Sequence, residues 1–252
     1  MNRKDIKCPV CGSTNLRKVF IQGTGSLEES YYVCRIHFND KIYFEENIKP
    51  QQLIGNWNAG FALDLHTESS IPLGISYNSK YSKIGGYMNE IKYHDNINLI
   101  PKLGKILSDF ICGKYISLTN NIYPYPMING MICTPPSKLN RTYQPVFEIA
   151  KEIKRNTHIE ILDSYFEKIK KTPGTKGIAI EDSRKFLNGA FRIKDKEKFS
   201  NKNILIFDDI FGTGTTLAEI TKTIKEQSDV KGIYVLAVTK TRTKSGLRDS
   251  NS

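Results

Sequence analysis

Residues 203–220 read NILIFDDIFGTGTTLAEI, and this stretch decides the fold that we predict for the rest of the chain. Residues 204–207 form a short, continuous apolar run, which is typical of a parallel strand buried on both faces. Asp208 and Asp209 follow where that strand is predicted to end. In an open α/β sheet the ligand crevice lies beyond the carboxyl ends of the strands, so the two carboxylates are placed to meet a ligand.

A loop rich in glycine and threonine follows the acidic pair, and it consists of Phe211, Gly212, Thr213, Gly214, Thr215 and Thr216. Glycines adopt backbone angles that are closed to other residues and let the main chain approach a ligand closely. The threonine hydroxyls and the amides that open the next helix add hydrogen-bond donors. We expect this loop to bind an anion, and a phosphate suits it best.

A phosphate loop beside two carboxylates is an unusual combination, because carboxylates repel phosphate unless they face another part of the ligand. A sugar phosphate satisfies both groups: the loop takes the 5′-phosphate, and Asp208 and Asp209 accept hydrogen bonds from ribose hydroxyls. A P-loop would need a lysine after the second glycine, and a dinucleotide site a third glycine at its own spacing. A tight strand-to-helix turn with an exposed acidic pair is the structural alternative.

Residues 208–216, DDIFGTGTT, with four apolar residues before them and Leu217 after them, resemble the phosphoribosyl-pyrophosphate (PRPP) signature of type I phosphoribosyltransferases. The resemblance implies an α/β fold with a twisted, mostly parallel sheet flanked by helices. It also implies displacement of pyrophosphate at C1 of PRPP, with Mg2+ held largely by substrate and water. Asp208 and Asp209 would be the catalytic residues that fix the ribose and favour the positive charge developing at C1. No residue suggests a general base.

The first strand of this domain is predicted at residues 127–133, and the loop after it consists of Thr134, Pro135, Pro136 and Ser137. In a phosphoribosyltransferase this first loop receives the pyrophosphate. Lys138 and Arg141 lie just beyond it and carry the charge that a diphosphate requires, although a solvated helix start explains them equally well. Residues 170–177 form a basic, glycine-containing loop suited to close over a bound anion as a lid.

Two pairs of metal-binding side chains occur near the start of the sequence, and they are Cys8, Cys11, Cys34 and His37. Both pairs have the same internal spacing, so together they make a tetrahedral Cys3His zinc site. Residues 16–20 and 31–33 predict a strand pair between them, as in a zinc ribbon. A segment of roughly forty residues with few core positions needs such a metal to fold. A redox pair, or cysteines without a ligand, is the alternative.

The sequence between these regions gives weaker signals. Residues 87–111 carry apolar side chains at helical intervals, and Pro101 starts a second helix, so we predict a helical hairpin. His66 beside Glu68 has the makings of a catalytic pair, although a structural histidine is the commoner case. The predicted divisions of the chain are a zinc-ribbon-like module at 1–45, a helical or linker segment at 46–120, the phosphoribosyltransferase-like domain at 121–243 and a disordered tail at 244–252.

A second resemblance covers more of the chain. Residues 183–193, SRKFLNGAFRI, resemble the Gly-Ala-Phe stretch of the competence-protein ComF family, which also combines an N-terminal zinc module with a type I phosphoribosyltransferase domain. Residues 91–95, IKYHD, resemble the lysine-aromatic element of that family. Its first-loop-and-helix block is similar to residues 133–137 together with Tyr143, Gln144 and Ala150. The resemblance implies a role in DNA uptake or processing.

The chain departs from the ComF pattern in two places. The arginine and asparagine that precede Gly-Ala-Phe in the family are out of register with Arg184 and Asn188, and residues 141–144 read RTYQ where the family has Gly-Phe-Asn-Gln. The contacts of a lid over the ligand are therefore not carried over from the family.

The 252 residues contain 37 Lys and Arg against 26 Asp and Glu, a formal net charge of +11. This excess favours a polyanionic partner, although the lysines are spread along the chain as in any lysine-rich protein. No apolar run approaches the ~20 residues that a membrane span needs, and residues 1–6 do not resemble a signal peptide. We expect a cytoplasmic protein without a membrane partner.

Two functions from different classes fit these observations. The first is an enzyme that transfers phosphoribosyl from PRPP to an unidentified acceptor. The second is a binding module that senses PRPP, or that associates with single-stranded DNA. Because the sequence shows no regular alternation of basic and aromatic residues, we expect only weak binding of single-stranded DNA. Nothing in the sequence fixes the oligomeric state, and a dimer is an open alternative.

Overall fold

The computed structural model describes residues 48–73, 76–112, 125, 127–136, 143–172 and 178–242, together with the backbone of two strands, β1 (Leu16–Phe20) and β2 (Ser30–Cys34). These two strands pair antiparallel, with Leu16 opposite Cys34, so the predicted strand pair is confirmed. Cys8, Cys11 and His37 lie outside the described residues, and zinc binding stays a prediction.

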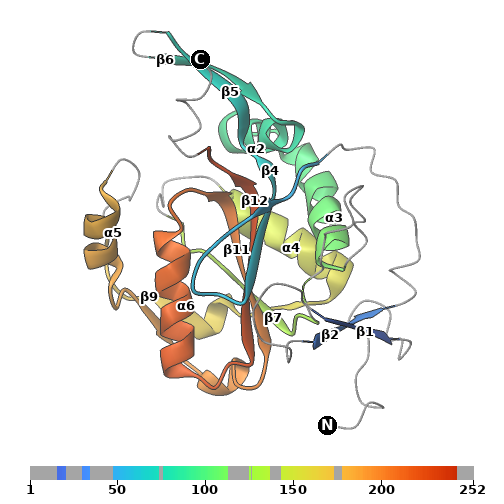
Figure 1. Ribbon diagram of the computed structural model, residues 1–252, viewed down its shortest axis with the longest axis vertical. Helices are drawn as coiled ribbons and strands as arrows, with labels where there is room; N and C mark the ends of the chain where they lie inside the picture. Colours follow the sequence, from blue (N-terminus) through green and yellow to red (C-terminus); the bar gives the residue numbers. More distant parts are fainter. Residues whose placement is uncertain are drawn as a thin grey trace.

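The centre of the fold is a six-stranded sheet in the order β3-β4-β12-β11-β7-β8. Its strands are β3 (Gln51–Gln52), β4 (Ala59–Leu65), β12 (Gly232–Lys240), β11 (Asn203–Phe211), β7 (Gly130–Cys133) and β8 (Glu160–Ile161). Figure 1 labels four of these strands, β4, β12, β11 and β7. All neighbours pair parallel except β3, which pairs antiparallel with β4 at the edge. The predicted α/β class with a mostly parallel sheet is confirmed.

Helices cover both faces of this sheet. One face packs against α2 (Lys83–Tyr93), α3 (Ile100–Ile111) and α4 (Pro145–Thr157), and the other against α6 (Thr215–Gln227). The short helix α5 (Ile180–Leu187) packs against α6. Because side chains alternate along a strand, Leu205 and Phe207 enter the first core while Ile204 and Ile206 enter the second. Burial on both faces explains the continuous apolar run of β11.

Two helices occur where residues 87–111 predicted them, α2 and α3, and Pro101 lies in the first turn of α3. Their close antiparallel packing as a hairpin is not observed, since α2 is seen nearly end-on and α3 lengthwise in Figure 1. The 3-10 turn η2 (Ile97–Leu99) joins them. None of the helices in the described ranges is long and apolar enough to cross a membrane.

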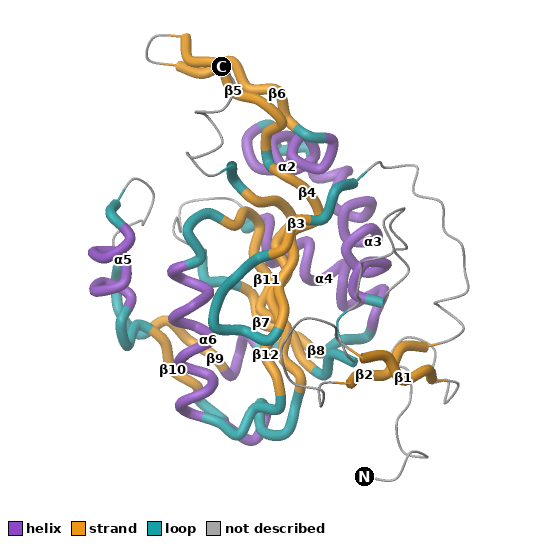
Figure 2. The backbone as a smooth tube through the Cα atoms, viewed as in Figure 1, coloured by secondary structure: helices purple, strands orange, loops and turns teal. Residues whose placement is uncertain are grey.

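The segment that we expected to be helical or linker, 46–120, also contains strands. It contributes β3 and β4 to the central sheet, and it continues into a hairpin of β5 (Thr67–Leu73) and β6 (Ser76–Tyr81) beyond the end of β4 (Figure 2). The expectation was wrong here because β4 combines Gly60 and Asp64 with apolar residues, so it shows neither a continuous apolar run nor strict alternation.

A second correction concerns the strand that carries the acidic pair. β11 does not end at Phe207, because Ile210 and Phe211 continue its ladder opposite Thr239 and Lys240 of β12. Asp208 and Asp209 are therefore strand residues near the carboxyl end. Alternation then places Asp209 on the same face as Phe207, towards α2.

The region between β8 and β11 forms a smaller antiparallel pair, β9 (Phe166–Lys168) with β10 (Phe191–Ile193). The turns η3 (Asp163–Tyr165) and η4 (Lys196–Lys198) flank this pair. The segment carrying α5 begins and ends at it, since Ile169 N donates to Ala190 O. Of the predicted lid at 170–177, residues 173–177 lie outside the described part of the chain.

Candidate functional site

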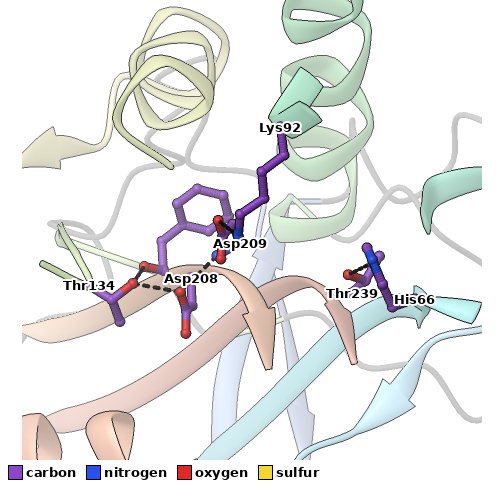
Figure 3. Close-up of polar contacts among 7 residues, drawn as sticks. His66, Lys92, Thr134, Asp208, Asp209 and Thr239 are labelled. Atoms are coloured by element: carbon purple, nitrogen blue, oxygen red, sulfur yellow. Dashed lines mark hydrogen bonds and ion pairs between the residues drawn. The ribbon is translucent and has the colours of Figure 1, made fainter. Parts of the chain in front are cut away.

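Polar side chains from five elements lie at the carboxyl edge of the central sheet, in two groups (Figure 3). Asp208 and Asp209 come from β11, and the other residues are Thr134 directly after β7, Lys92 from α2, His66 directly after β4 and Thr239 from β12. Parallel strands end at a common edge, which is why residues distant in sequence converge there. This edge is where the sequence predicted a ligand.

Asp208 is half-buried and accepts two hydrogen bonds at the same oxygen. Thr134 Oγ1 donates to its Oδ1 over 2.7 Å, and the backbone N–H of Asp209 donates to the same atom over 2.9 Å. Burial and the neighbouring charge of Asp209 raise the pKa of Asp208 to about 7, against the opposing influence of these hydrogen bonds and of Lys92. Asp208 thus exchanges a proton near neutral pH.

Asp209 has a different partner, the ammonium group of Lys92. The distance from Nζ to Oδ2 is 2.5 Å, and the side chains are only 17% and 20% exposed. We did not include Lys92 among the predicted site residues, although its segment, IKYHD, resembled an element of the ComF family. That resemblance was the only signal for it in the sequence.

Asp163 bonds to the end of β7, and Thr134 holds the first loop against β11. Asp163 Oδ1 accepts a hydrogen bond from Cys133 N over 2.8 Å, and Thr134 N donates to Phe207 O over 2.9 Å. Burial raises the pKa of both the Cys133 thiol and the Asp163 carboxyl. Pro135 and Pro136 follow half-buried, whereas Ser137 lies outside the described residues, as do Lys138 and Arg141.

The predicted phosphate loop connects β11 directly to α6. Gly214 has φ 75° and precedes the first helical residue, and a Cβ added there would lie 2.8 Å from Phe211 Cζ. Gly212 has no such need, because an added Cβ would meet nothing within 4 Å and its φ is not in the left-handed region. Only one of the two glycines is thus required by the backbone.

The threonines of the loop differ in their exposure. Thr213 is exposed, Thr215 is buried and Thr216 is half-buried. The hydroxyls of Thr213 and Thr215 lie 3.0 Å apart and share a hydrogen bond. The loop therefore holds part of its own shape through side chains, and its exposed residues adjoin the opening turn of α6, whose amides suit an anion.

His66 does not pair with Glu68. Its Nδ1 lies 3.0 Å from Thr239 Oγ1, and its ring meets the ring of Tyr81 edge to face, while Glu68 pairs with Lys80 at 2.7 Å. Burial and the charge of Lys92 lower the pKa of His66, so its imidazole is neutral at pH 7. The structural role given as the commoner case for His66 fits these contacts, and the catalytic pair with Glu68 is not formed.

Known proteins resemble this chain more clearly in sequence than in structure. No family model matches the sequence. Competence protein F of Haemophilus influenzae is 28% identical over 87 residues, which are 34% of this chain and 38% of that protein. The match thus spans less than half the length of that relative. The sequence resemblance to competence protein F is confirmed.

Two crystal structures of a hypoxanthine phosphoribosyltransferase from Staphylococcus aureus, in orthorhombic and tetragonal space groups, are also similar in part. They are 16% and 20% identical and give TM-scores of 0.32 and 0.29. Each covers 58% of this chain, and the matched parts are 68% and 64% of those chains. TM-scores this low do not establish a common fold.

Proposed function

We propose that this protein binds PRPP together with Mg2+ at the carboxyl edge of the sheet and transfers the phosphoribosyl group to an acceptor, releasing pyrophosphate. The observation that carries the proposal is the continuity of β11, the phosphate loop and α6, which places Asp208 and Asp209 a few residues from an anion-binding turn. One ligand with a phosphate at one end and hydroxyls beside it meets both groups.

The loop from Phe211 to Thr216 receives the 5′-phosphate in this proposal. The opening amides of α6 and the Thr213 hydroxyl donate to the phosphate oxygens, and the positive end of the helix dipole favours the negative charge. Gly214 lets the main chain turn into the helix at this point. The loop around Thr134, across β11, receives the diphosphate end.

The acidic pair acts on the ribose. Asp208 and Asp209 accept hydrogen bonds from the two ribose hydroxyls and orient the sugar. When the bond between C1 and the pyrophosphate oxygen breaks, positive charge develops at C1, and the nearby carboxylates stabilise it. The acceptor nitrogen then bonds to C1 and releases its proton to solvent, and pyrophosphate carries away the electron pair of the broken bond.

The side chains present suit Mg2+. The carboxylate oxygens of Asp208 and Asp209 are hard donors of the kind that this ion prefers, and two carboxylates with substrate oxygens are a common ligand set. Bound with the substrate, the ion would neutralise diphosphate charge and so ease departure of the leaving group.

The match to competence protein F supports a role in competence for the whole protein.

Calorimetry tests the binding step. With Mg2+ in excess, the double variant Asp208→Asn and Asp209→Asn should bind PRPP at least tenfold more weakly, ~1.4 kcal/mol, while its circular dichroism is unchanged. Asp195→Asn is the matched control, because Asp195 only caps the 3-10 turn η4. Unchanged PRPP affinity in the double variant would refute the sugar-phosphate site.

Release of pyrophosphate tests the transfer step. The wild-type protein, given PRPP and Mg2+, should release pyrophosphate in the presence of one member of a panel of purine, pyrimidine and amine acceptors. The double variant should not. Tight PRPP binding without release across the panel would leave a PRPP sensor as the function.

We also propose that Cys8, Cys11, Cys34 and His37 bind one structural zinc ion. The paired spacings and the β1–β2 hairpin support this site. Protein purified without chelators should carry about one zinc per chain, and Cys11→Ser or Cys34→Ser should lose it. Metal analysis that finds no zinc in the wild type removes the proposal.

A further inference from the structure

The ion pair between Lys92 and Asp209 differs from the other pairs in its burial. The Lys92 side chain is 17% exposed, whereas the lysines paired with Glu68, Asp109 and Glu148 are 74%, 65% and 57% exposed. Exposed pairs contribute little to stability. A partly buried pair requires desolvation of both charges and is weak evidence of a stabilising role. The burial of Lys92 therefore calls for another reason.

The fold fixes the position of Lys92 at both ends of α2. At the start, the Ser82 hydroxyl donates to Leu65 O over 2.5 Å and accepts from Gly85 N over 2.9 Å. A Cβ at Gly85 would lie 1.9 Å from His66 O, so the helix packs directly on the chain leaving β4. Near the end, the Tyr143 hydroxyl donates to Ile91 O, one residue before Lys92. The lysine is thus held over β11 by tertiary contacts.

The Lys92 ammonium group donates to a carboxylate oxygen of Asp209, and a bound metal ion would need that oxygen as a ligand. Asp208 Oδ1 is engaged by Thr134 and by the Asp209 amide, and Asp209 Oδ2 is engaged by Lys92 Nζ. Two adjacent carboxylates repel one another, and Lys92 supplies the positive charge that opposes this repulsion. A divalent cation brought to Asp209 would meet the ammonium at the same carboxylate, at a separation of a few ångströms.

We propose that Lys92 is a resident counter-ion that takes the place of the divalent cation at Asp209 in the free protein. The cation then binds strongly only as a complex with a diphosphate, whose negative charge gives the displaced ammonium a new partner. This inference rests on the proposed function for the identity of the diphosphate. It adds that Lys92 binds the diphosphate, and that free metal ion does not occupy the site first.

Binding of Mn2+ alone tests the first half of the inference. Electron paramagnetic resonance measures the concentration of free Mn2+ in a solution of the protein at low salt. Lys92→Met keeps the apolar stem and removes the charge, so it should bind Mn2+ at least about tenfold more tightly than the wild type, because ammonium and divalent ion repel at this range even in a dielectric like that of water. Adding Asp209→Asn to Lys92→Met should abolish the gain.

Two controls separate this effect from a general change of charge. Lys105→Met removes the lysine of a more exposed pair, the one with Asp109 on α3, and should leave Mn2+ affinity unchanged. Lys92→Arg keeps the charge and should behave as the wild type. If Lys92→Met folds poorly, Lys92→Gln serves for the same comparison. Unchanged or weaker Mn2+ binding in the folded neutral variant overturns the inference.

Binding of inorganic pyrophosphate with Mn2+ tests the second half. Here Lys92→Met should lose affinity, again by about tenfold, because the diphosphate loses a cation. Opposite effects on metal alone and on the metal–diphosphate complex are not expected from a structural role. If the neutral variant binds the Mn2+–pyrophosphate complex as tightly as the wild type, then Lys92 does not move from Asp209 to the diphosphate. That result overturns the second half of the inference. If the wild type binds neither PRPP nor pyrophosphate, the proposed function fails, whereas the result with Mn2+ alone still decides the role of Lys92.

Discussion

The phosphate loop and the acidic pair lie next to each other, but the chain builds them in opposite ways. The loop consists of consecutive residues, and its turn depends on one of them, Gly214. The acidic pair depends on Thr134 and Lys92, which are 74 and 117 residues distant from their partners. A contiguous motif can therefore specify the shape of a site, while distant elements determine its charge.

The loop side of this comparison is tested by changing its two glycines. Gly214→Val should destabilise the protein by about 3 kcal/mol, because valine at positive φ is strained and its side chain meets the Phe211 ring. Gly212→Ala should change the free energy of unfolding by less than about 0.5 kcal/mol, since the added Cβ enters open space. Urea denaturation measures both. Equal effects of the two substitutions would show that the turn does not depend on Gly214.

The acidic pair, the second region of the comparison, is tested by the pH dependence of the free energy of unfolding. Because the pKa of Asp208 is raised from 3.8 to about 7, the folded protein keeps a proton that the unfolded chain releases. Stability is therefore lost as pH rises between these two values, and the loss is complete above about pH 7. A rise of this size in the pKa amounts to roughly 4 kcal/mol, and we expect solvent at the half-buried Asp208 to screen about half of this. Asp208→Asn avoids the loss and keeps an oxygen to accept both hydrogen bonds, so it should be more stable than the wild type by roughly 2 kcal/mol at about pH 8.

The same measurement at about pH 4 is the control for Asp208→Asn. Both proteins then carry a neutral side chain at this position in the folded state, so their free energies of unfolding should differ little. If Asp208→Asn is more stable than the wild type by the same amount at both pH values, the titration of Asp208 is not the cause of the difference.

A smaller loss is expected from removing a single hydroxyl that bonds to the acidic pair, that of Thr134. Thr134→Val keeps the shape of the side chain but removes the hydrogen bond to Asp208, so it should destabilise the protein by about 1 kcal/mol above neutral pH. Thr241→Val is the matched control, because Phe211 O retains the backbone hydrogen bond from Thr241 N. Thermal unfolding of the two variants should separate them, and a larger loss from Thr241→Val would reverse the comparison.

The sequence predicted the local part of the site well. The apolar run of β11, the loop and the start of α6 lie where residues 203–220 indicated, because burial on both faces and a glycine turn leave signals in consecutive residues. The end of β11 was placed too early, since carboxylates in a strand look like the start of a loop. Pairing of Ile210 with Thr239 carries the strand further.

The partners of the acidic pair were beyond a reading of local pattern. Lys92 lies on a helix whose apolar period predicts the buried face but not which carboxylate its last turn reaches. The strands β4, β7, β11 and β12 end at a shared edge because of the strand order. The sequence of a single parallel strand does not show which strands lie beside it. The structural role of His66 was the commoner case in the sequence, but its partner Thr239 was not predicted, because it is distant in sequence.

The place of β12 between β4 and β11 also governs the order of events during synthesis. Ile233 N bonds Asn58 Oδ1 across 175 residues, and β4 has its parallel partner only in β12. The strand that leads to His66 and α2 therefore lacks its parallel neighbour, and has only the two-residue β3 beside it, until residues 232–240 have been translated. Loop closure over such a span is slow, and an unpaired strand is open to wrong partners meanwhile. A nascent chain that stalls before residue 232 would hold the phosphate loop without the neighbour that brings Lys92 to it.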